Sequence, residues 1–226
     1  MFVEVHIAVH GLERLSYLDQ SIEFLDKWDD DLNIIIHSNS PCPEKYKKFN
    51  WNHYETLIHP FELTWKCMEY IKNRDLTSDA YIYMEDDIGI PKETFEYWKR
   101  YQAPNLGIIR QTLNGRCDDI LELDQFKLKY SLYIYTKGPI YKGCWINNRE
   151  QMLQYIYDFD TILENEILKN LIWSRERAAY GNTTTKLAVI PLHEIENCCV
   201  FHLDSIKYDK GPFVKDLFTN VKNGSS

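Results

Sequence analysis

The feature of this chain that most constrains its fold is a regular alternation of strand-like and helix-like segments in its first half. Residues 2–9, "FVEVHIAV", repeat branched apolar side chains with the two-residue period of a β-strand, and residues 12–28 repeat leucine and isoleucine with the period of a helix. The same patterns predict strands within residues 32–40, 53–58 and 80–87, and helices within residues 61–74 and from Pro91 onward. Because parallel strands need long crossovers, this spacing predicts a mostly parallel sheet flanked by helices.

The second half of the chain is less regular and rich in tyrosine. Residues 105–113 and 127–146 carry strand signals without clean helices, which favours a mixed or antiparallel part of the sheet. Asn148 and Gln151 have the spacing of a capping box, which predicts a helix there that runs on toward Gly181. Two last strands are expected within residues 187–192 and 197–203. The fold class is therefore α/β, Rossmann-like, with a mixed, mostly parallel sheet.

The composition is that of a soluble globular domain, and no linker-like stretch interrupts it. We expect a single domain, with a first half at about 1–101, a second half at about 102–205 and a tail at 206–226. Asp and Glu total 34 against 26 Lys and Arg, and no basic block stands out, so binding to nucleic acid is disfavoured.

The N-terminal segment and the cysteines indicate a cytoplasmic protein. The apolar start of the chain contains Glu4, His6 and His10 and lacks a basic segment, so it matches neither a signal peptide nor a membrane anchor. No segment has the length of apolar residues that a membrane span needs. The 6 cysteines show no CxxC pair, so free thiols are expected in place of a zinc site or disulfides.

Three consecutive acids, Glu85, Asp86 and Asp87, follow the predicted strand "AYIYM". Carboxylates repel one another, and burying them without compensation is costly, so a divalent cation at this point would make the cluster favourable. Mn²⁺ and Mg²⁺ prefer oxygen ligands and bind one or two carboxylates together with water and phosphate oxygens. Alternatively, the acids are a solvated strand end that favours the start of the next helix.

Several motifs in this chain resemble those of one family. These are "HPFELTW", "YIYMEDDI", "YKGCWINNREQM", "SRERAAYG" and "VFHL", which span most of residues 1–205 in this order. Together they resemble nucleotide-sugar glycosyltransferases of the GT-A fold, and in particular the N-terminal glycosyltransferase domain of a chlorella-virus protein. "EDD" and "LTW" are the most specific parts, the first being similar to the acidic DxD-type motif of that family.

The resemblance implies a GT-A-like, metal-dependent hexosyltransferase that moves a hexose or deoxyhexose from a UDP-sugar to a glycan hydroxyl. It also implies that residues 1–101 are the nucleotide-binding half and residues 102–205 the acceptor or sugar half. It implies that Asp87 ligates Mn²⁺ or Mg²⁺ directly, that Glu85 supports the metal or binds it through water, and that Asp86 faces the ribose or the sugar. His202 is the expected second ligand from the protein, with His193 as the competing candidate. A core or surface histidine is the alternative for His202.

The nucleotide is expected at the carboxyl end of the first strand, where ligands of parallel α/β sheets bind. The expected donor-binding residues, besides Glu85 and Asp86, are Ala8, Val9, His10, Arg14, Ser38, Thr64, Lys66, Gly143 and Trp145. Some of these residues have a simpler alternative: Arg14 reads equally well as a helix-surface charge, Ser38 as a turn former and Trp145 as a core residue.

Glu176 and Asp86 are the catalytic candidates, and Glu176 is the candidate acid near the reacting carbon. A surface helix acid paired with a neighbouring arginine is the alternative for Glu176. An inverting enzyme would need such a carboxylate as general base, whereas a retaining enzyme would not, and the resemblance favours retention. The alternative functions are a metal-dependent phosphoryl or nucleotidyl transferase and a non-catalytic carbohydrate-binding domain. The sequence leaves the sugar, the acceptor and the oligomeric state open.

Overall fold

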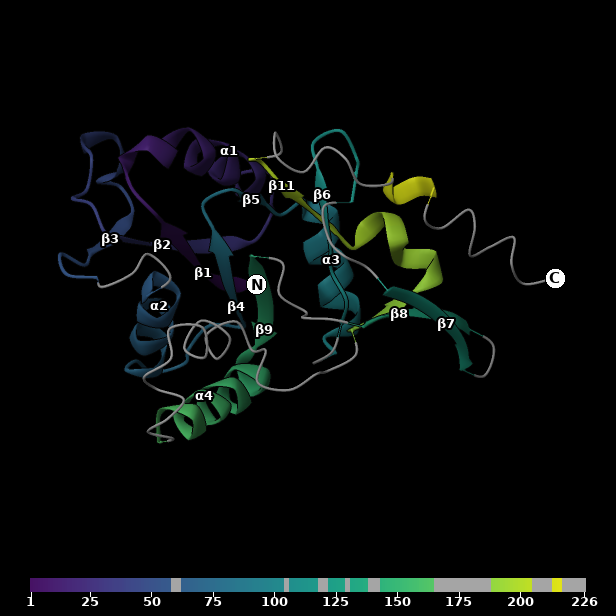
Figure 1. Cartoon of the computed structure of the whole chain (residues 1–226). Coiled ribbons are helices and arrows are strands. Elements are labelled where there is room, and N and C mark those ends of the chain that lie inside the picture. Colours follow the sequence, from purple (N-terminus) through teal and green to yellow (C-terminus); the bar gives the residue numbers. More distant parts are fainter. Residues whose placement is uncertain are drawn as a thin grey trace. The chain divides into compact units, whose positions relative to one another are not determined.

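The computed structural model describes residues 1–57, 62–103, 106–117, 122–128, 131–137, 143–164, 188–204 and 213–216 (Figure 1). The chain divides into two compact units. Unit 1 comprises Met1–Leu18, Asp29–Asp86 and Gly143–Thr184, and unit 2 comprises Asp19–Trp28, Asp87–Lys142 and Thr185–Ser226. Each unit consists of three separate segments of the chain, so the units do not coincide with the expected halves. The single-domain organisation stays a prediction.

Unit 1 is built on a five-stranded sheet in the order β3-β2-β1-β4-β9. Its strands are β1 (Phe2–Val9), β2 (Asp31–Ser38), β3 (Asn50–His53), β4 (Ala80–Glu85) and β9 (Cys144–Asn148). The first four run parallel, and β9 pairs antiparallel with β4. This confirms the mixed, mostly parallel sheet. The strand order reverses between β1 and β4, which is where such sheets bind ligands, beyond the carboxyl ends of the strands.

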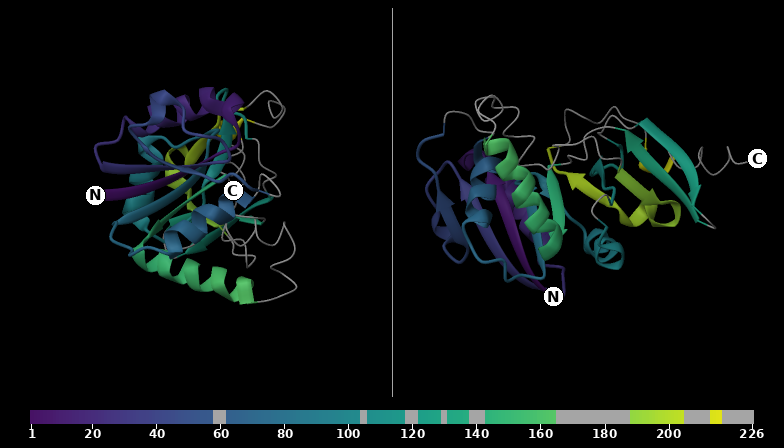
Figure 2. Two further views of the ribbon diagram at one scale, coloured as in Figure 1. Left: turned by 90° about the vertical axis from the view of Figure 1, so that its left-hand side faces the viewer. Right: turned by 90° about the horizontal axis from the view of Figure 1, so that it is seen from below.

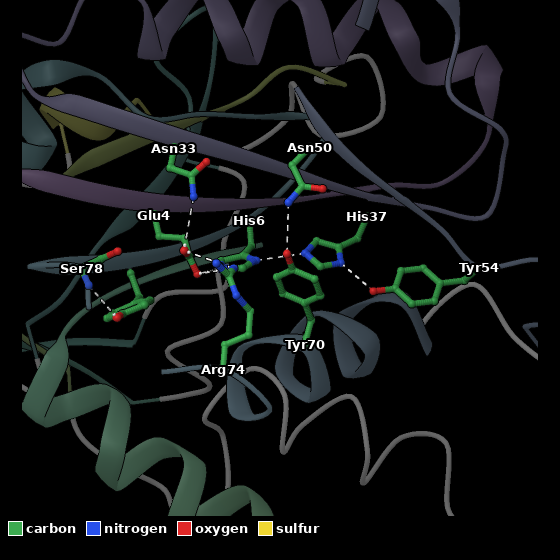
Figure 3. A network of polar contacts seen from close by, with 10 residues as sticks. Glu4, His6, Asn33, His37, Asn50, Tyr54, Tyr70, Arg74 and Ser78 are labelled. Atoms are coloured by element: carbon green, nitrogen blue, oxygen red, sulfur yellow. Dashed lines mark hydrogen bonds and ion pairs between the residues drawn. The ribbon is translucent and has the colours of Figure 1, made fainter. Parts of the chain in front are cut away.

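Strand β1 is buried on both faces of the sheet. Val3, Val5 and Ile7 are fully buried on one face, and Glu4 and His6 are buried on the other. The face that carries Glu4 and His6 lies against α2 (Glu62–Lys72), as Figure 3 shows. Burial on both faces is typical of a parallel sheet, but two polar side chains there require partners within the protein.

Helices α2 and α4 (Arg149–Glu164) pack side by side within unit 1 (Figure 2). The rings of Trp65 and Phe159 lie 4.4 Å apart between centroids, and Lys72 pairs with Asp160. Helix α4 also contacts β4 and β9. The two helices thus cover adjacent parts of the sheet.

The capping box predicted at the start of α4 is confirmed. The backbone N–H of Gln151 donates to Asn148 Oδ1 at 2.9 Å, and the backbone N–H of Asn148 donates to Gln151 Oε1 at 3.0 Å. Two otherwise unpaired N–H groups at the helix start are therefore satisfied. The expected helix end near Gly181 lies outside the described residues.

Unit 2 contains two three-stranded sheets, in the orders β5-β11-β6 and β10-β8-β7. The strands are β5 (Ile88–Gly89), β6 (Ile109–Thr112), β7 (Glu122–Leu128), β8 (Ser131–Lys137), β10 (Ala188–Pro191) and β11 (Cys199–His202). Strand β11 runs parallel to β6, and all other pairs in these sheets are antiparallel. The predicted mixed or antiparallel character of the tyrosine-rich region is confirmed.

Aromatic packing in unit 2 surrounds helix α3 (Lys92–Tyr101) and the end of α1 (Leu15–Leu25). The Trp28 ring stacks on Phe95 at 4.2 Å, and the Phe24 ring stacks on Phe201 of β11 at 5.5 Å. Short 3-10 helices lie at η1 (Leu12–Arg14), η2 (Glu44–Tyr46) and η3 (Leu192–Asn197). Pro91 occupies the N-cap position of α3, so the helix begins one residue later than the sequence predicted.

Two expectations about strands were wrong. The third strand is Asn50–His53 and not residues 53–58. Strand β4 ends at Glu85, and Asp86 and Asp87 form a turn, so the alternation of strand side chains does not extend to Asp87. The six cysteines are free thiols, as expected. Among the helices that the structure describes, none has the length and apolar character of a membrane span.

Candidate functional site

Asp86 is held by several hydrogen bonds at the carboxyl end of β4 in unit 1. It is fully buried, and its Oδ1 accepts hydrogen bonds from Arg14 Nε at 2.8 Å and from Arg14 Nη2 at 2.7 Å. The backbone N–H of His10 donates to Asp86 Oδ2 at 3.2 Å, and the backbone N–H of Asp86 donates to the carbonyl of Ala8 at 3.0 Å. Arg14, His10 and Ala8, all expected at the donor site, are thus brought together around Asp86.

The turn after β1 delivers Arg14 to this position. Gly11 has φ of 97°, a conformation that favours glycine, and a Cβ there would lie 2.4 Å from the Glu13 carboxylate oxygens. The 3-10 helix η1 follows at once and ends at Arg14. A guanidinium fork matches a carboxylate in two contacts, so the short loop holds Asp86 in a fixed orientation.

Ser38 and Val9 lie at the neighbouring strand ends. The Ser38 hydroxyl donates to the carbonyl of Val9 at 3.1 Å and accepts the backbone N–H of Ser40 at 3.1 Å. These bonds fix the carboxyl ends of β1 and β2 next to each other, in agreement with the parallel pairing of Val9 with Ser38. Contact of either residue with a nucleotide stays a prediction.

Asp87 and His202 are neighbours within unit 2. His202 Nε2 lies 3.3 Å from Asp87 Oδ2, and the two residues are 6% and 7% exposed. The backbone N–H of Leu203 donates to the Asp87 carbonyl at 2.7 Å, and His202 pairs with Ile88 across β5 and β11. The strand pairing therefore brings together two residues that lie 115 positions apart in the sequence.

This pair has the chemistry of a divalent metal site. A carboxylate oxygen and an imidazole nitrogen both ligate Mn²⁺, and neighbouring ligands of an octahedral ion with bonds of about 2.1 Å lie about 3 Å apart. The observed 3.3 Å is close to that separation. Within the described part of the chain, no group of three or more His, Cys, Asp or Glu side chains is arranged to hold a metal. An ion here would thus need ligands from water or substrate phosphate as well.

Glu85, Gly143 and Trp145 lie around the end of β4. The backbone N–H of Glu85 donates to the carbonyl of Gly143 at 2.8 Å, and Gly143 has φ of 72°, which favours glycine. Trp145 is 9% exposed, with its ring 5.9 Å from Tyr83 and 5.3 Å from Tyr155. These aromatic contacts agree with the core alternative for Trp145, and the donor roles of all three stay predictions.

Thr64 and Lys66, the candidates on α2, have partners within unit 1. The Thr64 hydroxyl is buried and lies 2.9 Å from the Tyr83 hydroxyl, and Lys66 Nζ pairs with Glu69 at 2.7 Å. His193, the competing metal ligand, has 66% of its side chain exposed and hydrogen-bonds Tyr101 at 3.0 Å. Glu176 lies outside the described residues, so its catalytic role stays a prediction.

Sequence reasoning missed a buried chain of polar side chains in unit 1. His6 lies between Glu4 and His37, with a contact of 2.9 Å to each, and His37 contacts the Tyr54 hydroxyl at 2.9 Å (Figure 3). Both imidazoles are fully buried. The signal was present in β1, where Glu4 and His6 are two residues apart and therefore share one face of the strand.

No protein-family model matches the sequence, and no curated protein matches it. Among solved structures, the chain is similar to S. aureus TarS 1-349, with 16% identity, 83% of this chain and 57% of that chain covered, and a TM-score of 0.49. The glycosyltransferase GlyE of Streptococcus pneumoniae has 9% identity, coverage of 95% and 59%, and a TM-score of 0.46. The galactosyltransferase LgtC, solved with donor and acceptor sugar analogs, has 9% identity, coverage of 78% and 70%, and a TM-score of 0.46.

This chain spans less than two thirds of the TarS fragment and of GlyE. Every TM-score above is below 0.5, so these similarities do not assign a function to this chain. The resemblance to a viral glycosyltransferase domain is not tested by these three structures and stays a prediction.

Proposed function

We propose that this chain is a metal-dependent glycosyltransferase that moves the sugar of a UDP-sugar donor to a hydroxyl of a glycan acceptor. The observation that carries the proposal is the buried contact of Asp87 with His202, at 3.3 Å. The motif pattern predicted both residues as metal ligands, although a strand-end acid and a late histidine need not have been neighbours. Their contact supports a common role.

In this proposal Asp86 and its partners bind the donor. The Arg14 guanidinium and the His10 N–H orient the Asp86 carboxylate, which we assign to a hydroxyl of the ribose or the sugar. A buried carboxylate that is already held by charged and backbone donors needs no rearrangement when the substrate arrives. Glu85, two residues before Asp87 in the sequence, is proposed to support the metal.

Asp87 and His202 would hold Mn²⁺ or Mg²⁺. The ion, when bound, supplies positive charge for the diphosphate that departs. With retention of configuration, the departing phosphate oxygen can take the proton of the acceptor hydroxyl, so no protein base is required. With inversion, Glu176 is the proposed base on that hydroxyl.

The test is an assay of UDP release. Purified protein is incubated with a panel of UDP-, GDP- and CDP-sugars, in Mn²⁺ or in EDTA, with free nucleotide measured. We expect UDP from at least one UDP-sugar in Mn²⁺ and none in EDTA. Cleavage of nucleoside triphosphates instead would indicate a phosphoryl or nucleotidyl transferase, and glycan binding without turnover would indicate a carbohydrate-binding domain.

Two variants test the metal ligands, each with a matched control. Asp87→Asn keeps the size of the side chain and His202→Ala removes the imidazole, and each should lower Mn²⁺-dependent turnover by about 100-fold or more. The controls change the exposed residues Asp26→Asn and His193→Ala, and they should retain turnover. Activity of Asp87→Asn equal to that of its control would move the metal elsewhere.

A further inference from the structure

The buried polar chain Glu4–His6–His37–Tyr54 runs between α2 and one face of the sheet in unit 1 (Figure 3). It begins with Glu4 in the first half of β1 and ends at Tyr54, the residue that follows β3. Arg74 lies 3.3 Å from Glu4 Oε2, and Asn33 Nδ2 donates to the same oxygen at 3.4 Å. The chain therefore has a charged, hydrogen-bonded group at one end and a hydroxyl at the other.

The ionisation of these groups is set by their surroundings. Burial acts to raise the pKa of Glu4, but the His6 hydrogen bond and the Arg74 charge outweigh it, so the pKa lies below its usual value. Burial lowers the pKa of His6 and lowers that of His37 well below the usual value, so both imidazoles are neutral at pH 7. Burial raises the pKa of Tyr54, which keeps its proton.

These states allow only one direction for the three hydrogen bonds. A carboxylate only accepts, so His6 Nε2–H donates to Glu4, and His6 Nδ1 carries no proton. His37 Nε2–H then donates to His6 Nδ1, which leaves His37 Nδ1 without a proton. The Tyr54 hydroxyl must therefore donate its single proton to His37 Nδ1, and toward any other partner its oxygen can only accept.

Tyr54 lies at the carboxyl end of the parallel strands, where we propose that the nucleotide binds. The backbone N–H of Tyr54 donates to the carbonyl of Ser38, the last residue of β2, at 2.9 Å. In sheets with the order 3-2-1-4, the phosphates bind after the first strand and the ribose near the end of the second, so the base lies toward the third. The side chain of Tyr54 is only half-buried, so part of it remains accessible.

We propose that Tyr54 is a specificity-determining residue, whose hydroxyl oxygen is held by the buried Glu4–His6–His37 relay as an acceptor for a ring N–H of the nucleobase. Uracil carries a donor at N3, whereas cytosine carries an acceptor there. The relay thereby favours UDP over CDP. This inference rests on the proposed function, because it names the base that the donor site selects.

The first experiment measures the relay itself and needs no ligand. In long-range ¹H–¹⁵N spectra of the histidine rings at pH 7, His6 and His37 should both be neutral, with the proton on Nε2. Assignment by His6→Gln and His37→Gln variants identifies their signals. A proton on Nδ1 of either ring, or a charged ring, would overturn the inference independently of any enzyme activity.

The second experiment compares UDP and CDP binding by calorimetry in Mn²⁺. Wild-type protein should prefer UDP, and Tyr54→Phe should reduce the UDP to CDP preference by about three- to tenfold, the worth of one hydrogen bond. Tyr70→Phe is the matched control, because that tyrosine lies against both histidines and its hydroxyl accepts from Asn50 at 3.1 Å, outside the relay. Its preference should equal that of wild type.

A substitution of His37 separates the relay from simple packing. His37→Gln offers one donor and one acceptor and should keep the preference, whereas His37→Leu should lose it. If wild type prefers UDP and Tyr54→Phe leaves the preference unchanged, the inference is wrong and the proposed function stands. If wild type binds neither nucleotide, the proposed function fails and the base selectivity fails with it.

Discussion

Acidification should destabilise this protein through the two buried histidines of the relay. His6 and His37 are neutral in the folded chain, because burial lowers the pKa of each. In the unfolded chain both would titrate near pH 6.5. Below that pH the unfolded state binds more protons than the folded state, so stability is complete above about pH 6.5 and is lost as the pH falls.

The size of the effect follows from the two histidines. If an imidazole stays neutral down to pH 5 in the folded state, the protein loses about 2 kcal/mol of stability between pH 7 and pH 5, so the upper bound for the two histidines is about 4 kcal/mol. The groups that face the pair act in opposite senses, since Glu4 raises and Arg74 lowers the pKa of His6. Because a typical domain has about 5–15 kcal/mol of stability in total, this loss would be easily measured.

The assay is urea unfolding of the whole chain at pH 5, 6 and 7. The double variant His6→Gln, His37→Gln preserves a donor and an acceptor at each position without a titrating group, so its loss of stability between pH 7 and 5 should be smaller than that of wild type, by at most about 4 kcal/mol. Replacing the exposed His53 and His193 by glutamine is the matched control and should leave the wild-type dependence unchanged. Equal pH dependence of wild type and the relay variant would refute the reasoning.

Three further substitutions test the packing of the site and its supports, each by urea unfolding at pH 7. Arg14→Lys replaces the guanidinium fork on the buried Asp86 by a point charge and should cost about 1–3 kcal/mol, whereas an unchanged midpoint would mean that the pair is dispensable. Asn148→Ala removes the cap of α4 and should cost about 1 kcal/mol, with no loss at all speaking against the capping box. Arg100→Ala leaves Glu194, with 8% of its side chain exposed, without its 2.6 Å partner and should cost about 1–3 kcal/mol; a smaller cost than that of exposed ion pairs would contradict this.

Much of the fold could be predicted because its pattern is local. Strand β1 has the predicted bounds, and β2, α2 and β4 lie where the two-residue and helical periods placed them. Strand β3 was missed because it is only four residues, "NWNH", and is only partly buried, so it carries no apolar alternation. Its position is set by pairing with β2, which the sequence does not display.

The site was predictable as a set of residues but not as a set of contacts. The resemblance to glycosyltransferases indicated His202, and the pairing of β11 with β5 brings it to Asp87. Nothing in the sequence indicated that Arg14, expected among the donor-binding residues, pairs with Asp86. Likewise, Glu4 and His6 share a face of β1, but their contact with His37 depends on the register between β1 and β2.

The acidic cluster shows most clearly why contacts matter more than motifs. A regular strand would have sent Asp86 to one side and Asp87 to the other by alternation alone, but β4 ends before both. Each of the two carboxylates nevertheless has its own compensation, Asp86 from a guanidinium and a backbone N–H, and Asp87 from an imidazole. A buried carboxylate held by a charged fork is suited to orient a hydroxyl, because its charge is already balanced. A carboxylate beside an imidazole is suited to a cation, because both groups are metal ligands. The different partners, and not the shared position in the motif, are therefore the reason to assign the two neighbouring acids to different tasks.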